Sequence, residues 1–374
     1  MTKKVDVYLV SSTLHFFWAL LLAHSHKDRE SHLIFIDQNS TKPLNFYSIL
    51  HKTLTPFTSV KMFAGREFKG WKLLKCRKSQ FAIMQRMIEH LSVDRVFLGN
   101  DRSVLGQFFL KEAKTHNTAC IGCYLDDGVF SYLGRKASKK KTERYVDAMF
   151  KKLSYGLWYD SPLTIGASRW IDELWLMHPQ QRSPLLQATN AIQICPNQNA
   201  LKSVGDFAKQ ILQAESVNAQ QIEALDVLIT LPNPLIFSKI PDYQKSIETL
   251  LLDLNQKKLK VGVKYHPVTG DKDILNVQKM GALLLPSQVS FEMILPFLRQ
   301  CLVIGDMSTT ILLARFIDQD ANVIMMKLGD DDYSQKMALL CKNLRIDVVI
   351  PDEIAPKIQL KATLACKTHH LGGD

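Results

Sequence analysis

Short apolar segments of strand length alternate with longer segments of helical periodicity through nearly all of the 374-residue chain. One series runs from Val5–Val10 to Glu173–Met177, and a second begins near Asp226. Strands that alternate with helices favour βαβ units, in which parallel strands form a sheet that helices cover. The pattern therefore predicts an α/β fold with two Rossmann-like domains, and the length of the chain fits that number.

The polar region between the two series indicates where one domain ends. We expect an N-terminal domain over residues 1–215 and a C-terminal domain over residues 216–374. Residues 180–198 are polar and predict an irregular segment, and residues 199–213 predict a helix. A closing helix over 352–366 is a candidate to pack back on the N-terminal domain.

Composition limits the class of protein. There are 47 Lys and Arg residues against 36 Asp and Glu, and the net charge of +11 favours an anionic partner: a nucleic acid, a membrane surface or an acidic substrate. Seven cysteines are an odd and scattered set, which is typical of a cytoplasmic protein. Cys120 and Cys123 lie in a strand pattern, so we expect buried thiols. The N-terminal apolar run, Phe16–Ala23, is far shorter than the roughly 20 residues that span a membrane.

Two adjacent carboxylates follow a predicted buried strand over Cys120–Leu125. Asp126 and Asp127 come directly after it, and Gly128 allows a sharp turn. Ligands of open α/β sheets bind at the carboxyl ends of the strands, which places these side chains where chemistry is expected. The alternative is a polar turn in which Asp bonds to its own backbone.

The strongest charge feature lies just downstream of this turn. Residues 135–152 carry eight basic side chains against only Glu143 and Asp147. This run could steer an anionic acceptor towards the carboxylates, or it could be a solvated loop and helix face. The candidate acceptor-binding residues are Arg135, Lys136, Lys139, Lys140, Lys141 and Arg144.

In the second series, a predicted strand over Leu259–Tyr265 ends at His266 and Pro267. Proline biases the preceding residue towards an extended conformation, which projects the imidazole at the carboxyl end of the strand. Lys264 adds positive charge nearby. A His-Pro pair is weak evidence alone, because His178 is also followed by proline.

Two predicted helix starts in the same series carry polar side chains. Ser290 is an N-cap candidate with Glu292 in the first turn, and the carboxylate could accept hydrogen bonds from a ribose diol. Residues 305–310 follow a strand and open a helix, where hydroxyls and backbone N–H groups suit a phosphate. Ordinary capping is the alternative for both segments. The phosphate candidates are Ser308, Thr309 and Thr310.

This combination resembles bacterial sialyltransferases of the two-Rossmann-domain type, called GT-B, and within them the polysialyltransferase and lipooligosaccharide sialyltransferase group. The shared pattern is an acidic pair before glycine, then His-Pro, then a pair of hydroxyl residues. The matching segments here are residues 126–128, 266–267 and 308–310, in that order. The hydroxyl pair departs from the Ser-Ser that is frequent in the family. The resemblance implies two parallel-sheet domains facing each other across a cleft.

The resemblance also implies roles for these residues. Asp127 would be the general base that takes the proton of the acceptor hydroxyl, and Asp126 would orient the turn or the acceptor. His266 would act as the acid that faces the departing phosphate. Glu292 would hold the ribose, with Ser290, Lys264 and Pro267 in the same nucleotide site. The phosphate would bind at 308–310.

The implied reaction is transfer of sialic acid from CMP-sialic acid, with inversion, to a bacterial surface glycan of a capsule or lipooligosaccharide. Extension of a polysialic acid chain is one such reaction. We expect no cofactor and no metal, although Asp126, Asp127 and Asp306 would be the ligands of a magnesium-dependent alternative. Adjacent carboxylates at a strand end tend to point to opposite faces, which disfavours it.

Two rival functions remain open. The same scaffold could use another CMP-activated nonulosonic acid or Kdo. A basic nucleic-acid-binding protein would also explain the charge, but no helix-turn-helix, zinc finger or RNP-like aromatic pattern supports it. We therefore expect an anionic glycan as partner and no nucleic acid. The expected location is the cytoplasm, and the basic run is compatible with peripheral binding at the inner membrane.

Overall fold

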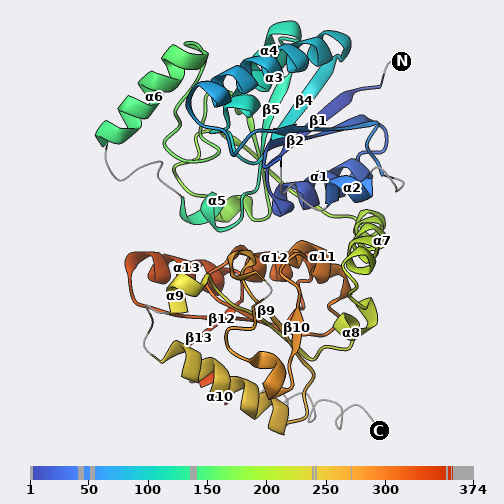
Figure 1. Ribbon diagram of the computed structural model, residues 1–374, viewed down its shortest axis with the longest axis vertical. Coiled ribbons are helices and arrows are strands. Elements are labelled where there is room, and N and C mark those ends of the chain that lie inside the picture. Colours follow the sequence, from blue (N-terminus) through green and yellow to red (C-terminus); the bar gives the residue numbers. More distant parts are fainter. Residues whose placement is uncertain are drawn as a thin grey trace. The chain divides into compact units, whose positions relative to one another are not determined.

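The computed structural model describes residues 3–40, 46–50, 55–134, 141–237, 240, 242–270, 272–350, 353–354 and 356. The chain divides into two compact units, one ending at Phe207 and the other beginning at Ala208 (Figure 1). The division falls inside helix α7, Gln198–Ala214, rather than after residue 215. The predicted closing helix over 352–366 lies largely outside the described residues.

The described part of the first unit contains a seven-stranded parallel sheet in the order β3-β2-β1-β4-β5-β6-β7. Its strands are β1 (Val5–Val10), β2 (Glu30–Gln38), β3 (Ser59–Ala64), β4 (Val93–Leu98), β5 (Ile121–Leu125), β6 (Glu173–Leu176) and β7 (Asn190–Gln193). Besides α7, its helices are α1 (Thr13–Ser25), α2 (Phe46–Leu50), α3 (Gly70–His90), α4 (Val104–His116), α5 (Val129–Leu133), α6 (Lys141–Tyr155) and the short 3-10 turn η1 (Pro179–Gln181).

The second unit has a six-stranded parallel sheet within its described residues, in the order β10-β9-β8-β11-β12-β13. Its strands are β8 (Val227–Thr230), β9 (Val261–Lys264), β10 (Leu283–Leu285), β11 (Leu302–Gly305), β12 (Val323–Met326) and β13 (Asp347–Val349). Its helices are α8 (Ala219–Glu223), α9 (Pro234–Phe237), α10 (Tyr243–Gln256), α11 (Phe291–Ile294), α12 (Thr309–Ile317) and α13 (Asp332–Asn343), with 3-10 turns η2 (Pro267–Thr269), η3 (Val277–Met280) and η4 (Leu295–Phe297).

Each sheet reverses its strand order once, and the reversal determines where a ligand can bind. The chain moves outward from β1 to β3, returns to β4 on the other side of β1, and then continues to β7. In the second sheet the same reversal lies between β8 and β11. Loops diverge at such a switch point and leave a crevice outside the carboxyl ends of the strands. The segments after β1 and β4, and those after β8 and β11, are therefore the natural site positions.

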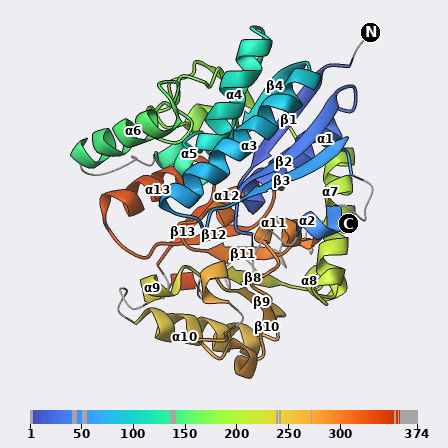
Figure 2. The ribbon, with the colours of Figure 1, turned by 45° about the horizontal axis from the view of Figure 1, so that its top comes forward.

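The strands form where the sequence is apolar because both faces of each parallel sheet are covered. Odd-numbered residues of β1, such as Val7 and Leu9, join the core beneath α3 and α4. These two helices pack side by side on one face of the sheet (Figure 2). The other face buries aromatic side chains, with the Tyr8 and Phe97 rings stacked at 4.8 Å. Cys120 and Cys123 are buried and unpaired, as the sequence predicts.

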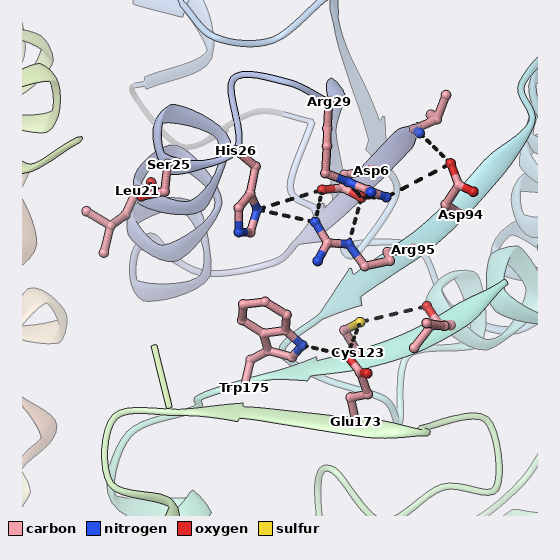
Figure 3. A network of polar contacts seen from close by, with 12 residues as sticks. Asp6, Leu21, Ser25, His26, Arg29, Asp94, Arg95, Cys123, Glu173 and Trp175 are labelled. Atoms are coloured by element: carbon pink, nitrogen blue, oxygen red, sulfur yellow. Dashed lines mark hydrogen bonds and ion pairs between the residues drawn. The ribbon is translucent and has the colours of Figure 1, made fainter. Parts of the chain in front are cut away.

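One charged cluster interrupts this aromatic layer. The Asp6 carboxylate is fully buried on β1 and accepts hydrogen bonds from Arg29 Nε at 2.8 Å and Arg95 Nε at 2.9 Å. The guanidinium of Arg95 also lies 5.4 Å from the ring centre of Trp175 (Figure 3). Two cations satisfy the single buried carboxylate, so the cluster fixes β1 against the strands and loops beside it.

Two predicted segments differ in the structure. The region predicted as irregular, residues 180–198, contains the edge strand β7. All four β7 residues are partly or fully exposed, so β7 lacks the apolar signal of a buried strand. The apolar pattern after Ser290 predicts one helix over Phe291–Leu298, but the structure is α-helical only to Ile294 and then tightens into η4, which contains Pro296. Proline has no N–H to continue the α-helical ladder.

Within the described residues, no helix combines the length and the apolar character that crossing a bilayer requires.

Candidate active site

The acidic turn lies at the carboxyl end of β5, next to the switch point of the first sheet. Gly128 has φ of 68° and ψ of −136°, a conformation that a residue with a side chain rarely adopts. Strand β5 ends at Leu125, and Gly128 is the N-cap of α5, which begins at Val129. Asp126 and Asp127 are consequently held in a tight turn.

Asp126 points into the protein and holds that turn. Its Oδ1 accepts from the Gly128 N–H at 2.7 Å, and its Oδ2 accepts from the Met177 N–H at 2.9 Å and from the Tyr132 hydroxyl. The side chain is fully buried, and burial raises its pKa to about 6 although these hydrogen bonds oppose the shift. Asp126 therefore acts on the shape of the site and does not face solvent.

Asp127 points the other way and remains 19% exposed. Its Oδ1 lies 2.9 Å from Nε2 of His15, and its backbone N–H donates to Ser131 Oγ at 2.9 Å. Oδ2 makes no hydrogen bond within the described residues, so it is available to a ligand. One oxygen of Asp127 fixes the carboxylate and the other can accept a proton.

His15 is the functional residue that sequence reasoning missed. It lies in the first turn of α1, just after β1, and is only 2% exposed. Its Nδ1 lies 3.3 Å from Ser11 Oγ, so both ring nitrogens have partners. The ring occupies space that Gly99 leaves open, because a Cβ at that position would lie 2.1 Å from the imidazole.

The same helix supports the turn at a second point. The Trp18 Nε1–H donates to the backbone carbonyl of Asp126 at 3.1 Å. Trp18 is fully buried, one helical turn beyond His15. The N-terminal apolar segment that superficially resembles a signal sequence is therefore the support of the acidic turn.

Asp127 and His15 line a pocket of about 1160 Å³ within the first unit. Four cations also line it: Arg66, Arg77, Arg102 and Lys151. Arg77 is paired with Asp37, and Lys151 is bonded to Asp147 at 2.9 Å. The side chains of Arg66 and Arg102 make no hydrogen bond or ion pair in the described part of the chain.

The predicted acceptor residues of the basic run belong to a segment of which the structure describes only the helical part. Arg135, Lys136, Lys139 and Lys140 lie outside the described residues, and only the backbone of Lys141 and Arg144 is described, in α6. Of the four observed pocket cations, Lys151 belongs to the basic run, in α6, Arg77 lies in α3, and the other two follow strands. Arg66 follows β3 and Arg102 follows β4.

In the second unit, His266 lies exposed at the carboxyl end of β9. Its Nδ1 accepts a hydrogen bond from the Val268 N–H at 3.2 Å, so the neutral ring carries its proton on Nε2. Partial burial and the nearby charge of Lys264 lower its pKa. The neutral imidazole thus presents an Nε2–H donor to a ligand, and Pro267 begins η2 directly behind it.

Lys264 is buried, with its Nζ donating to the carbonyl of Pro286 at 3.1 Å. It therefore supports the loop that leads to Ser290. Ser290 occupies the N-cap position of α11, but its Oγ makes no capping bond and is buried without a hydrogen-bond partner in the described residues. Glu292 is half-buried in the first turn of this helix.

The predicted phosphate segment lies at the switch point of the second sheet. Ser308 is the N-cap of α12 without a side-chain capping bond, and its Oγ lies 2.5 Å from Thr310 Oγ1. Thr310 Oγ1 also lies 3.3 Å from Thr230 Oγ1, at the end of β8. Thr309 is the first helical residue. Burial raises the pKa of the neighbouring Asp306 to about 6.

The two turn carboxylates diverge, with Asp126 in the interior and Asp127 on the pocket. A divalent ion needs carboxylate oxygens that converge on one point, so this pair offers no shared chelate. Among the described residues, no group of three or more His, Cys, Asp or Glu side chains has the arrangement of a metal site.

Neither a search of protein-family models nor one of curated protein sequences finds a match. Solved structures do match. An α/β-galactoside α-2,3-sialyltransferase from Photobacterium phosphoreum has a TM-score of 0.55 at 14% identity, covering 95% of this chain and 100% of that one. A sialyltransferase from Photobacterium damsela has a TM-score of 0.51 at 12% identity, covering 94% and 82%.

A UDP-N-acetylglucosamine 2-epimerase from Methanocaldococcus jannaschii is similar to the same degree, with a TM-score of 0.52, 9% identity, and coverage of 96% of this chain and 92% of that one. With two parallel-sheet α/β units, these likenesses establish the GT-B fold, as the sequence predicts. The fold is shared by enzymes of different activities, so the function has to be argued from the site.

Proposed function

We propose that this protein is a glycosyltransferase, and specifically an inverting, metal-independent sialyltransferase that uses CMP-sialic acid. The observation that carries the proposal is Asp127, a partly exposed carboxylate with one oxygen fixed by His15 and the other open to a cationic pocket. An acceptor hydroxyl is a weak nucleophile, and a positioned base with a free oxygen is what it needs.

In the proposed reaction, the acceptor oxygen attacks the anomeric carbon while the bond from that carbon to the phosphate oxygen breaks. The acceptor proton passes to Oδ2 of Asp127, and direct attack inverts the anomeric centre. His15 keeps the carboxylate in place and is a positioning residue. Asp126 has the same kind of role, because it holds the turn from within.

The leaving group would be bound by the second unit. CMP is a good leaving group, so charge stabilisation suffices. The Nε2–H of His266 would donate to a phosphate oxygen, and the hydroxyls of Ser308 and Thr310 at the N-terminus of α12 would supply further donors. Ser290 and Glu292 are proposed to bind the nucleotide.

The acceptor would be an anionic glycan on a bacterial surface, and polysialic acid is one such chain. Arg66 and Arg102 support this, since two pocket cations whose side chains have no partner among the described residues suit carboxylates of a substrate. A lipooligosaccharide acceptor fits the same chemistry. Another CMP-activated nonulosonic acid or Kdo is the alternative donor, because these groups recognise phosphate and carboxylate more than sugar substituents.

The test is release of CMP from CMP-sialic acid with EDTA present, using oligosialic acid and lactose as acceptors. Acceptor-dependent release should be lost in Asp127→Asn and His266→Ala. Matched controls are Asp320→Asn and His116→Ala, which change exposed residues of the same types. A wild type that releases no CMP with either acceptor would refute the donor, and a panel of other CMP-sugars would then be tried.

A further inference from the structure

Helix α6 carries a stripe of exposed apolar side chains. Tyr145, Val146, Met149, Phe150 and Leu153 are between 48% and 76% exposed. At 100° per residue, these positions fall within an arc of about 140° on one side of the helix. Figure 1 shows α6 at the periphery of the first unit. Five large apolar side chains on one stripe exceed the scattered exposure of an ordinary surface helix.

The opposite side of α6 is anchored to the protein. Lys151 Nζ lies 3.3 Å from the Tyr159 hydroxyl, and the ring of Tyr155 meets that of Phe81 edge-on at 6.1 Å. The apolar stripe is therefore presented outward by a helix that is fixed from behind. Leu157, just after the helix, is 82% exposed and extends the apolar surface.

Charge indicates what this surface binds. The sequence from residue 135 to residue 152, which includes most of α6, has eight basic and two acidic residues. An apolar stripe on a helix that belongs to so basic a stretch of sequence suits an anionic lipid surface, where apolar side chains enter the interface and cations meet headgroups. A second copy of this chain would bring two such basic segments together, which their repulsion disfavours.

The same helix also borders the pocket. Phe150, Lys151, Ser154 and Tyr155 of α6 line it, as does Trp71 at the start of α3, a residue that is 85% exposed. Binding of α6 to a bilayer would thus place the mouth of the pocket at the lipid surface.

We propose that α6 is a membrane-docking helix that binds the surface of an anionic bilayer through its apolar stripe. Docking does not depend on the reaction catalysed. If the proposed function also holds, the pocket receives a glycan whose anchor lies in that bilayer.

The test is co-sedimentation of the full chain with vesicles of phosphatidylcholine alone or with added phosphatidylglycerol. The triple variant Val146→Gln, Met149→Gln, Leu153→Gln changes three of the five stripe residues, none of which lines the pocket. We expect wild type to bind the anionic vesicles and the variant to bind about tenfold more weakly or worse. The matched control changes three exposed apolar residues of the second unit: Leu252→Gln, Ile274→Gln and Leu339→Gln.

Wild type that stays in the supernatant with anionic vesicles would overturn the proposal. Equal binding by the stripe variant and wild type would also overturn it. So would a wild-type dimer in sedimentation velocity that the stripe variant abolishes, in the absence of vesicle binding, because the stripe would then bind a second copy of the chain. CMP release with a soluble acceptor should be the same for wild type and the stripe variant. The two readouts separate docking from catalysis, since either can fail while the other succeeds.

Discussion

The substitution Gly99→Ala tests whether the His15 ring is held where the structure places it. The added Cβ would lie 2.1 Å from the ring, whereas ordinary contacts begin at 3.4 Å, so the ring has to move by about 1.3 Å, the difference between the two. We expect a loss of about 1–3 kcal/mol in the free energy of unfolding, typical of overpacking. In a His15→Ala background the space is free, and the same substitution should cost less than about 0.5 kcal/mol.

The measurement is urea unfolding followed by tryptophan fluorescence. All five tryptophans belong to the first unit, so the signal reports on that unit alone: Trp18, Trp71, Trp158, Trp170 and Trp175. Gly99→Ala in a His116→Ala background is the control, because His116 is exposed and should leave the full cost in place. An equal cost in the His15→Ala and His116→Ala backgrounds would refute the contact as the cause.

Three further predictions concern the first unit and its pocket. Asp6→Ala leaves two partly buried arginines without their carboxylate, so the same fluorescence titration should record a loss of about 3–5 kcal/mol; a loss below 1 kcal/mol would contradict this. Burial raises the pKa of Asp126 to about 6 from 3.8, so its stabilising effect is complete below about pH 4 and is lost as pH rises through 6. Relative to Asp126→Asn, wild type should therefore lose stability over this window, and a gain would reverse the assignment. Arg102→Ala should raise KM for oligosialic acid several-fold and leave KM for lactose unchanged in initial-rate assays; an equal rise for both would mean that Arg102 does not read acceptor charge.

The alternation of strands and helices was predictable because periodicity is a local property of the sequence. Val5–Val10 is apolar except for Asp6, since helices cover both faces of its sheet, and the predicted strand matches β1 residue for residue. The signal fails where burial is incomplete. Strand β7 is paired only with β6 at the edge of the sheet, and its exposed side chains have no apolar pattern to detect.

The place of the acidic turn followed from the general rule that ligands bind at the carboxyl ends of parallel strands. His15 could not be identified in the same way, because it lies 112 residues from Asp127. In the sequence it only interrupts an apolar helix. The signal that was present is its position: a titratable residue after Ser11 and Ser12, at the end of the first strand.

The cations that line the pocket, like His15, could not be assigned to one site from the sequence. Sequence reasoning gave weight to residues 135–152 because charge density is visible along a chain. Arg66 and Arg102 are 36 positions apart, the difference of their residue numbers. They line one pocket because each follows the carboxyl end of a strand, where a parallel sheet gathers its loops on one edge. Topology can thus gather single arginines around one pocket, and the dense charge of residues 135–152 suits the bilayer surface proposed for α6.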